Sequence, residues 1–316
     1  MTVPRGSRRL KGMLTVSRGL SRGLACGLVF VGSLIACGSD DSSGGTTPTK
    51  STAQASSGCG KTGAPSGLQS SQSIQVDGAK RTYELFVGSA HDGKTPLPLV
   101  FILHGGGGTG AGVRKSFDIE SVANGKAIFV YPDATNKYPN SWDLDDNADK
   151  NPDIKLFDAL RASIASSYCV DSQRVFAWGS SAGAYFANQL ACRRGGELRA
   201  IAANSGGAPY GGDDKTDKYD DSGNLICPES PTAALIIHGT SDGTVDVSEG
   251  KAALAWWRKA NGCAAGDGTD YDPSPCKALA GCNAARPVVG CFIPGMGHTI
   301  WPEHGTDVTW KFFSSL

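Results

Sequence analysis

The pattern of apolar and polar residues along the chain predicts strands that alternate with helices. Apolar and polar residues alternate over 75–87 around Asp77-Gly78, which predicts a β-hairpin because Asp-Gly favours a tight turn. Apolar runs without alternation follow, as expected for strands buried on both faces of a sheet. These runs are 97–103, 127–131, 174–178, 200–203, 233–237 and 287–293.

Helical spacing occurs between these runs. Apolar side chains within 153–168 fall on one stripe of a helix, namely Ile154, Phe157, Leu160, Ile164 and Tyr168. Further helices are expected over 182–192, 247–260 and 307–313. A hairpin followed by strands and helices in alternation predicts an α/β protein whose mostly parallel central sheet has helices on both faces. In such sheets the functional residues lie at the carboxyl ends of the strands.

The first 37 residues predict a targeting segment. Six basic residues precede the first acid, and the apolar stretch 24–36 is too short to span a membrane as a permanent helix. It ends at Leu34-Ile-Ala-Cys37 and resembles a bacterial lipoprotein signal, cleaved before Cys37 and lipidated there; a plain secretory signal is the alternative. We therefore expect an exported protein, either secreted or attached to the outer membrane or cell surface through that lipid alone.

Composition divides the rest of the chain into a linker and one domain. Residues 38–57 are mainly Ser, Thr, Gly and Ala and predict a flexible linker, followed by a folded domain over 58–316. The whole chain has 30 basic and 30 acidic residues; because six of the basic residues precede Cys37, 24 basic and 30 acidic residues follow it. This negative balance argues against a nucleic-acid-binding protein.

The cysteines indicate an oxidising compartment. Without Cys26 and Cys37 an even number remains, which predicts four disulfides: Cys59, Cys169, Cys192, Cys227, Cys263, Cys276, Cys282 and Cys291. No compact metal-ligand spacing is present, and we expect neither a metal nor a cofactor. The acidic stretch 143–149 resembles the start of a calcium loop but lacks the glycine and glutamate of that motif, which favours a solvated acidic loop.

A candidate nucleophile follows the strand at 174–178. The sequence there is Gly179-Ser-Ser-Ala-Gly183, a G-x-S-x-G motif centred on Ser181. Between a strand and a helix, this motif forms a sharp turn that exposes the serine at the edge of the sheet. An ordinary turn built from small residues is the alternative.

A base and an acid follow in the order that α/β-hydrolases use, serine then acid then histidine. His298, in a glycine-rich loop after the last strand, is favoured as the base over His304. Asp242, after the strand 233–237, is favoured as the acid, with Asp246 in reserve. His104 and His238 end buried strands before a glycine, and we expect them to shape loops.

The glycine-rich stretch 104–110 predicts an oxyanion hole. It lacks the GK[ST] ending of a phosphate-binding loop. In a serine hydrolase it supplies a main-chain N–H, assigned here to Gly106 with Gly105 or Gly107 as alternatives. Ala182, which follows the nucleophile, supplies the second N–H.

Together these motifs resemble the extracellular feruloyl esterase and polyhydroxybutyrate depolymerase group of the α/β-hydrolases. The resemblance covers nearly the whole chain after residue 58 and implies the α/β-hydrolase fold, with Ser181, Asp242 and His298 as catalytic residues. It rests on Gly58-Cys-Gly-Lys61 and on residues 103–106, 168–171, 174–183, 190–192, 238–242, 261–263, 297–298 and 301–302.

The chain also departs from the family pattern. Ala184 replaces a common glycine, four glycines occupy 105–108, and residues 262–291 hold an additional cysteine pair. Relatives carry a local bridge before the last strand, which implies a Cys263–Cys282 disulfide and leaves Cys276–Cys291 as the additional one. These departures leave catalysis intact and leave the acyl or sugar specificity open.

The resemblance implies a serine carboxylic ester hydrolase that acts through an acyl-enzyme on an ester-bearing polysaccharide or polyester. Residues 58–61 and 310–313 look more like the feruloyl esterase branch of the group, which implies feruloyl esters on xylan rather than polyhydroxybutyrate. A non-catalytic surface lipoprotein, binding glycan through exposed Trp142 and Trp301, is the alternative from another class. We expect a monomer.

Overall fold

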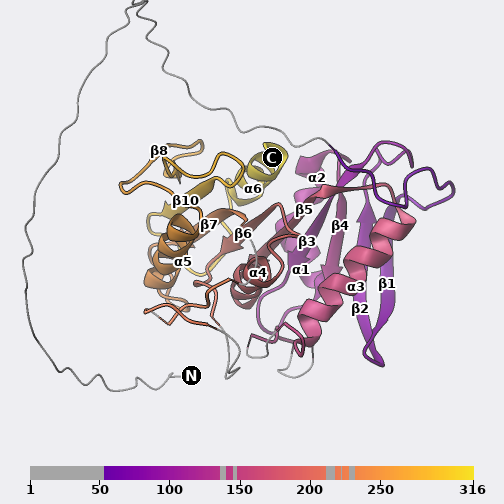
Figure 1. Ribbon diagram of the computed structural model, residues 1–316, viewed down its shortest axis with the longest axis horizontal. Helices are drawn as coiled ribbons and strands as arrows, with labels where there is room; N and C mark the ends of the chain where they lie inside the picture. Colours follow the sequence, from indigo (N-terminus) through magenta and orange to yellow (C-terminus); the bar gives the residue numbers. More distant parts are fainter. Residues whose placement is uncertain (1–52, 136–139, 145–147, 211–217, 222, 228–231) are drawn as a thin grey trace, which may run out of the picture. The chain divides into compact units, whose positions relative to one another are not determined.

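One sheet forms the centre of the protein. The computed structural model describes residues 53–135, 140–144, 148–210, 218–221, 223–227 and 232–316. Within them, ten strands pair in the order β1-β2-β4-β3-β5-β6-β7-β10-β9-β8 (Figure 1). The strands are β1 (Gly67–Val76), β2 (Ala79–Val87), β3 (Leu97–Leu103), β4 (Ile128–Pro132), β5 (Val170–Ser180), β6 (Ala200–Asn204), β7 (Ala233–Gly239), β8 (Thr269–Asp270), β9 (Lys277–Ala278) and β10 (Val288–Ile293).

The middle of the sheet is parallel and its two edges are antiparallel. Strands β4, β3, β5, β6, β7 and β10 run parallel to their neighbours in that order. The β1–β2 hairpin and the short β8–β9 pair add antiparallel strands at opposite edges. This arrangement confirms the predicted α/β class and its initial hairpin. Because these six strands are parallel, their carboxyl ends all lie on the same side of the sheet, above the strand ends rather than beside the outer strands.

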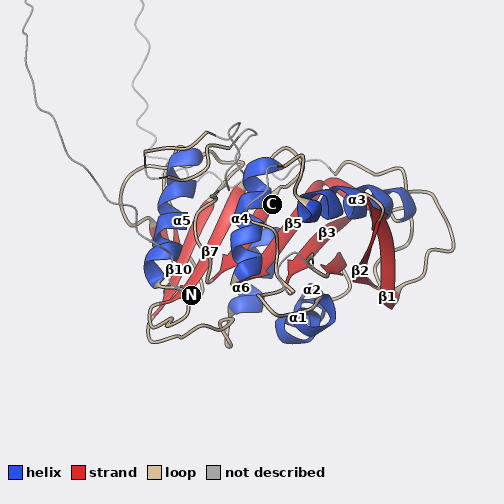
Figure 2. Cartoon of the chain, turned by 90° about the horizontal axis from the view of Figure 1, so that it is seen from below, coloured by secondary structure: helices blue, strands red, loops and turns tan. Residues whose placement is uncertain are grey.

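Helices cover both faces of the sheet, as predicted. Figure 2 shows α3, α4 and α5 on one face and α1, α2 and α6 on the other. The alternating side chains of β3 serve both layers, because Leu99 and Phe101 pack in one apolar core whereas Val100 and Ile102 pack in the second. The helices are α1 (Gly110–Phe117), α2 (Ile119–Ala123), α3 (Pro152–Ser167), α4 (Ala182–Arg193), α5 (Val247–Ala260) and α6 (Gly305–Ser314).

The sequence pattern did not predict the helices and strands in which apolar residues show little periodicity. Helix α1 begins with Gly-Ala-Gly and owes its start to Thr109, whose side chain accepts a hydrogen bond from the N–H of Gly112. Strand β1 extends back to Gly67 through a polar, mostly exposed stretch interrupted by a bulge. Strands β8 and β9 have two residues each. A local cap therefore starts α1, whereas strands β1, β8 and β9 depend on pairing with other strands.

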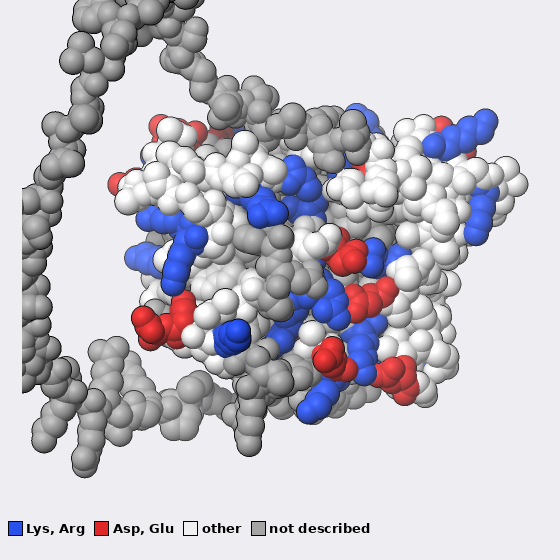
Figure 3. Space-filling view, in the orientation of Figure 1, with Lys and Arg blue, Asp and Glu red and all other residues white. Residues whose placement is uncertain are grey.

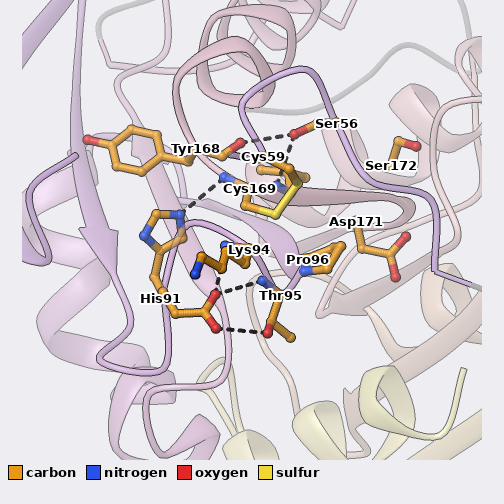
Figure 4. Close-up of a disulfide and its surroundings, with 12 residues drawn as sticks. Ser56, Cys59, His91, Lys94, Thr95, Pro96, Tyr168, Cys169, Asp171 and Ser172 are labelled. Atoms are coloured by element: carbon orange, nitrogen blue, oxygen red, sulfur yellow. Dashed lines mark hydrogen bonds between the residues drawn. A yellow bond between two sulfur atoms is a disulfide. The ribbon is translucent and has the colours of Figure 1, made fainter. Parts of the chain in front are cut away.

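The residues just before the predicted domain pack on the sheet. Gln54 donates its N–H to the Asp171 carboxylate, and the N–H of Ser56 donates to the carbonyl of Val170. Figure 4 shows Ser56 beside the Cys59–Cys169 disulfide. Within the predicted linker, residues 54–56 are thus held against β5 by main-chain hydrogen bonds. The targeting segment 1–37, its lipidation site Cys37 and residues 38–52 lie outside the described residues.

Four disulfides join the eight cysteines considered above. Two of them have the pairing that the family resemblance implies, and the other two tie the ends of β5 and α4 to distant loops. The pairs are Cys263–Cys282, Cys276–Cys291, Cys59–Cys169 and Cys192–Cys227. This cross-linking is typical of extracellular proteins.

The surface carries charges of both signs. Acidic side chains lie among the basic ones on the face shown in Figure 3. None of the described helices has the length and apolarity to cross a bilayer.

Candidate active site

Ser181 occupies the turn between β5 and α4, in a conformation that side-chain-bearing residues rarely adopt. Its φ of 54° and ψ of −121° lie outside the regions that L-residues favour. The flanking glycines permit this turn: a Cβ atom at Gly179 would lie 2.1 Å from the carbonyl oxygen of Gly183, and one at Gly183 would lie 2.3 Å from that of Leu103. The geometry is that of a nucleophile elbow.

His298 and Asp242 are in direct contact. Nδ1 of the imidazole lies 2.7 Å from Oδ2 of the carboxylate, although the two residues are 56 positions apart in the sequence. The Asp242 side chain is fully buried, whereas that of His298 is 25% exposed. Oδ1 of Asp242 accepts the N–H groups of Thr244 and Val245, each at 2.9 Å. The carboxylate is therefore held on both oxygens.

The charge of Asp242 fixes the tautomer of His298. Burial acts to raise the pKa of Asp242, but the hydrogen bonds from Val245, His298 and Thr244 outweigh it and lower the pKa to about 2. An ionised carboxylate only accepts hydrogen bonds, so Nδ1 of His298 carries the proton. Nε2 of the neutral ring is then left as an acceptor, which is the form a general base requires.

Asn204 connects Ser181 to the loop that carries His298. Its carbonyl oxygen accepts the N–H of Ser181 at 2.9 Å, and its side-chain Nδ2 donates to the carbonyl of Thr299 at 3.0 Å. Among the described residues no hydrogen bond joins the Ser181 hydroxyl to His298; such bonds often tighten only when substrate binds. The sequence analysis did not single out Asn204, although its place at the carboxyl end of a buried strand is the available signal.

The glycine-rich loop after β3 lies against the nucleophile elbow. A Cβ atom at Gly105 would lie 3.5 Å from Cβ of Ser181, and one at Gly106 would lie 3.9 Å from Cβ of Ala182. The N–H of Gly107 already donates to the carbonyl of Asn140 at 2.8 Å. Of the three donors left open by the sequence, Gly107 is therefore occupied, whereas Gly105 and Gly106 both lie next to the elbow.

His104 and His238 shape the loops beside the site, as expected. Nδ1 of His104 donates to the carbonyl of Gly105 at 2.7 Å, and Nε2 accepts the N–H of Ala134. Burial lowers the pKa of His104, which keeps the ring neutral for this pair of bonds. Nε2 of His238 donates to the carbonyl of Val245 at 3.0 Å and lies 3.5 Å from the Asp242 carboxylate.

Comparison with known proteins identifies relatives along most of the chain. Feruloyl esterase C of Emericella nidulans is 30% identical over 262 residues, which cover 76% of this chain and 85% of that protein. Probable feruloyl esterase C of Aspergillus terreus is 30% identical over 279 residues, covering 82% and 91%. The chain belongs to the feruloyl esterase family of α/β-hydrolases.

A solved structure supports the fold of this esterase. Acetyl xylan esterase from Aspergillus awamori superposes with a TM-score of 0.62 at 18% sequence identity, covering 78% of this chain and all of that one. No protein-family model matches the chain. The family membership makes the protein a carboxylic ester hydrolase. The non-catalytic alternative is thereby wrong.

The two tryptophans assigned to substrate binding are buried in the esterase. Trp142 is 1% exposed, stacks on Phe186 and donates its Nε1–H to the carbonyl of His104 at 2.7 Å. Trp301 is 5% exposed and packs in the core beneath α6. The expectation of exposed aromatic rings is wrong, because both rings fill the interior beside the functional loops. Through its hydrogen bond to the carbonyl of His104, Trp142 holds the start of the glycine-rich loop.

The reserve residues lie apart from the His298–Asp242 pair. Asp246 caps α5, where its side chain accepts the N–H of Ser248 at 2.8 Å. His304 precedes α6 and contacts the ring of Trp301 edge-on. Neither residue makes a hydrogen bond with the other or with Ser181 within the described chain.

The acidic stretch 143–149 is only partly solvated. Asp143 is fully buried, and its N–H donates to the Asp153 carboxylate at 2.7 Å. Residues 145–147 lie outside the described part of the chain. In the described ranges, no cluster of three His, Cys, Asp or Glu side chains is arranged to hold a metal. The expectation of a solvated loop is therefore wrong for Asp143.

Proposed function

We propose that this esterase hydrolyses feruloyl esters of plant polysaccharides through an acyl-enzyme formed on Ser181. The observation that carries the proposal is the 30% identity to feruloyl esterase C over most of both chains. The arrangement at the carboxyl edge of the sheet supports it. Ser181, Asp242, His298 and Gly106 follow the carboxyl ends of four different strands; His298 contacts Asp242, and Gly106 lies next to Ala182.

Acylation begins with attack of the Ser181 hydroxyl on the ester carbonyl carbon. Nε2 of His298 takes the hydroxyl proton, and the imidazolium that forms is stabilised by Asp242. The carbonyl oxygen gains negative charge, which the N–H groups of Gly106 and Ala182 stabilise. The imidazolium then gives its proton to the leaving alkoxide, and the sugar hydroxyl departs from the acyl-enzyme.

Deacylation repeats these steps with water. His298 removes a proton from a water molecule that attacks the acyl carbon, and the second tetrahedral intermediate uses the same two N–H donors. The imidazolium returns the proton to Oγ of Ser181 as the bond between Oγ and the acyl carbon breaks. The free carboxylic acid leaves, and the serine is restored.

The substrate class is tested by comparing two polymers. We expect the purified enzyme to release ferulate from feruloylated arabinoxylan and to leave a polyhydroxybutyrate suspension turbid, with Ser181→Ala as the control. Loss of the nucleophile typically costs ~10⁴–10⁶ in kcat. Clearing of the polyester without release of ferulate would assign the enzyme to the depolymerase group, and activity in Ser181→Ala would reject the proposed nucleophile.

We also propose that the chain is exported as a lipoprotein that acts as a monomer. The leader with its Leu34-Ile-Ala-Cys37 ending supports lipidation, and the four disulfides support export. Metabolic labelling with radioactive palmitate is expected to mark the wild type and not Cys37→Ser. Equal labelling of both would exclude Cys37, and light scattering of the purified domain measures the oligomeric state.

A further inference from the structure

Asn204 occupies the place where the nucleophile strand and the base loop meet. It is the last residue of β6, it is fully buried, and β6 lies between β5 and β7 in the sheet. In the sheet register it pairs with Ser180 on one side and Ile237 on the other. Its main chain thus lies next to the elbow at Ser181. Its side chain lies at the carboxyl end of β6.

The main chain of Asn204 restrains the elbow. Its carbonyl accepts the N–H of Ser181, the residue with the rare backbone conformation. Such conformations cost about 1–3 kcal/mol and persist only where surrounding contacts enforce them. The hydrogen bond is one of these contacts, and it fixes the serine relative to β6.

The side chain of Asn204 restrains the base loop, defined here as residues 294–299. Nδ2 donates to the carbonyl of Thr299, the residue after His298, and also lies 3.2 Å from Oγ of Ser205. The orientation of the amide follows from its partner, since only the nitrogen can donate to a carbonyl. One residue therefore holds Ser181 through its main chain and the base loop through its side chain.

Two further hydrogen bonds hold the base loop before His298. Ser241 donates its N–H to the carbonyl of Met296, and the N–H of Gly295 donates to the hydroxyl of Thr240. These bonds tie the first half of the loop to the segment that carries Asp242. They orient the base toward its acid but do not connect it to the nucleophile.

The buried amide has an energetic cost that packing alone does not explain. Oδ1 of Asn204 is buried and accepts no hydrogen bond from the described residues. A polar atom left in this state costs about 1–3 kcal/mol, and an apolar side chain of similar size would avoid that cost. The bond from the NH₂ group to the base loop gives a reason for an amide, rather than an apolar side chain, at this buried position.

From this geometry we propose that Asn204 is a positioning residue that sets the distance between His298 and Ser181. The inference rests on the proposed catalytic roles of those two residues. Asp242 fixes the rotation of the His298 imidazole. Asn204 holds the base loop through Thr299 and bonds Ser181 through its main chain. Loss of the bond to Thr299 lets the base loop shift, and a displacement of about 1 Å can cost on the order of 10²-fold in rate.

The test compares two buried asparagines. Asn204→Ala is expected to lower kcat for p-nitrophenyl acetate about 10- to 100-fold while KM stays within about threefold, because the loop shift affects the reaction and not substrate contacts. Asn188 is a matched control, since its side chain bonds only structural groups, the carbonyls of Ala184 and Gly207 and the indole of Trp257. Asn188→Ala should lower the melting temperature and keep kcat.

A second variant keeps the inference testable if Asn204→Ala does not fold. Asn204→Asp has the same shape but presents carboxylate oxygens to the Thr299 carbonyl in place of a donor, so the same loss of kcat is expected. A kcat within twofold of wild type in a folded Asn204 variant overturns the inference, as does an equal loss in Asn188→Ala. If Ser181→Ala also remained active, the proposed function would fail instead.

Discussion

Nδ1 of His298 lies 2.7 Å from Oδ2 of Asp242, and the carboxylate is fully buried whereas the imidazole remains partly exposed. This asymmetry suits the proposed roles, because a base must reach the substrate whereas the acid must only hold the base. Removing the carboxylate charge changes the tautomer of the base without changing the shape of the site.

Asp242→Asn is expected to lower kcat on the order of 10⁴-fold, since an amide NH₂ group facing His298 favours the wrong tautomer. Asp246→Asn should keep nearly full activity, because Asp246 caps α5 and asparagine caps helices equally well. Steady-state kinetics with p-nitrophenyl acetate compares the two variants. A collapse of kcat in Asp246→Asn alone would move the role of the acid to Asp246.

The stability of the enzyme should depend on pH through Asp242. Its pKa lies at about 2 in the folded protein, below the ordinary value of 3.8, so the ionised carboxylate stabilises the fold above pH 4 and this contribution disappears as pH falls toward 2. A shift of this size corresponds to about 2 kcal/mol.

Urea unfolding between pH 5 and pH 2 measures this contribution. Asp242→Asn should be less stable than wild type by about 2 kcal/mol at pH 5, and the difference should narrow as the pH falls. Ser181→Ala leaves the contacts of Asp242 in place and should follow the wild type. A difference that stayed constant with pH would contradict the lowered pKa.

The disulfides should stabilise the fold unequally. Cys59–Cys169 closes a loop with a sequence separation of 110, and Cys276–Cys291 one of 15. Chain entropy alone gives about 4.7 kcal/mol for a 100-residue loop and about 3 kcal/mol for a 15-residue loop. Replacing the first pair with serines should therefore lower the free energy of unfolding more than replacing the second. Chemical denaturation ranks the two variants, and the reverse order would refute the entropic explanation.

Gly183→Ala should be strongly destabilising, since the new Cβ atom would lie 2.3 Å from the carbonyl oxygen of Leu103. Overpacking of this kind costs about 1–3 kcal/mol or more. Gly243→Ala is a control, because no atom outside its chain neighbours lies within 4 Å of the added Cβ. Thermal unfolding compares the variants, and equal melting temperatures would show that the elbow can widen without cost.

The pattern of residues determined the parts of the fold that depend on neighbours in the chain. Unbroken apolar runs predicted the parallel strands, and helical spacing predicted α3 to α6. Both predictions succeed because the buried face of a helix or strand sets the spacing of apolar residues along it. Ser181, Asp242 and His298 follow strands in the order that α/β-hydrolases use. Because parallel strands have their carboxyl ends on the same side of the sheet, the sequence alone predicted the candidate site.

Tertiary structure alone decided which residues support that site. The bond from Asn204 to Thr299 joins residues 95 positions apart, and the N–H of Gly107 is occupied by Asn140 from another loop. The burial of Trp142 and the hydrogen bonds of Gln54 and Ser56 to β5 likewise depend on segments distant in sequence. Local periodicity reports which face of an element is buried, whereas such contacts depend on how the strands are ordered in the sheet.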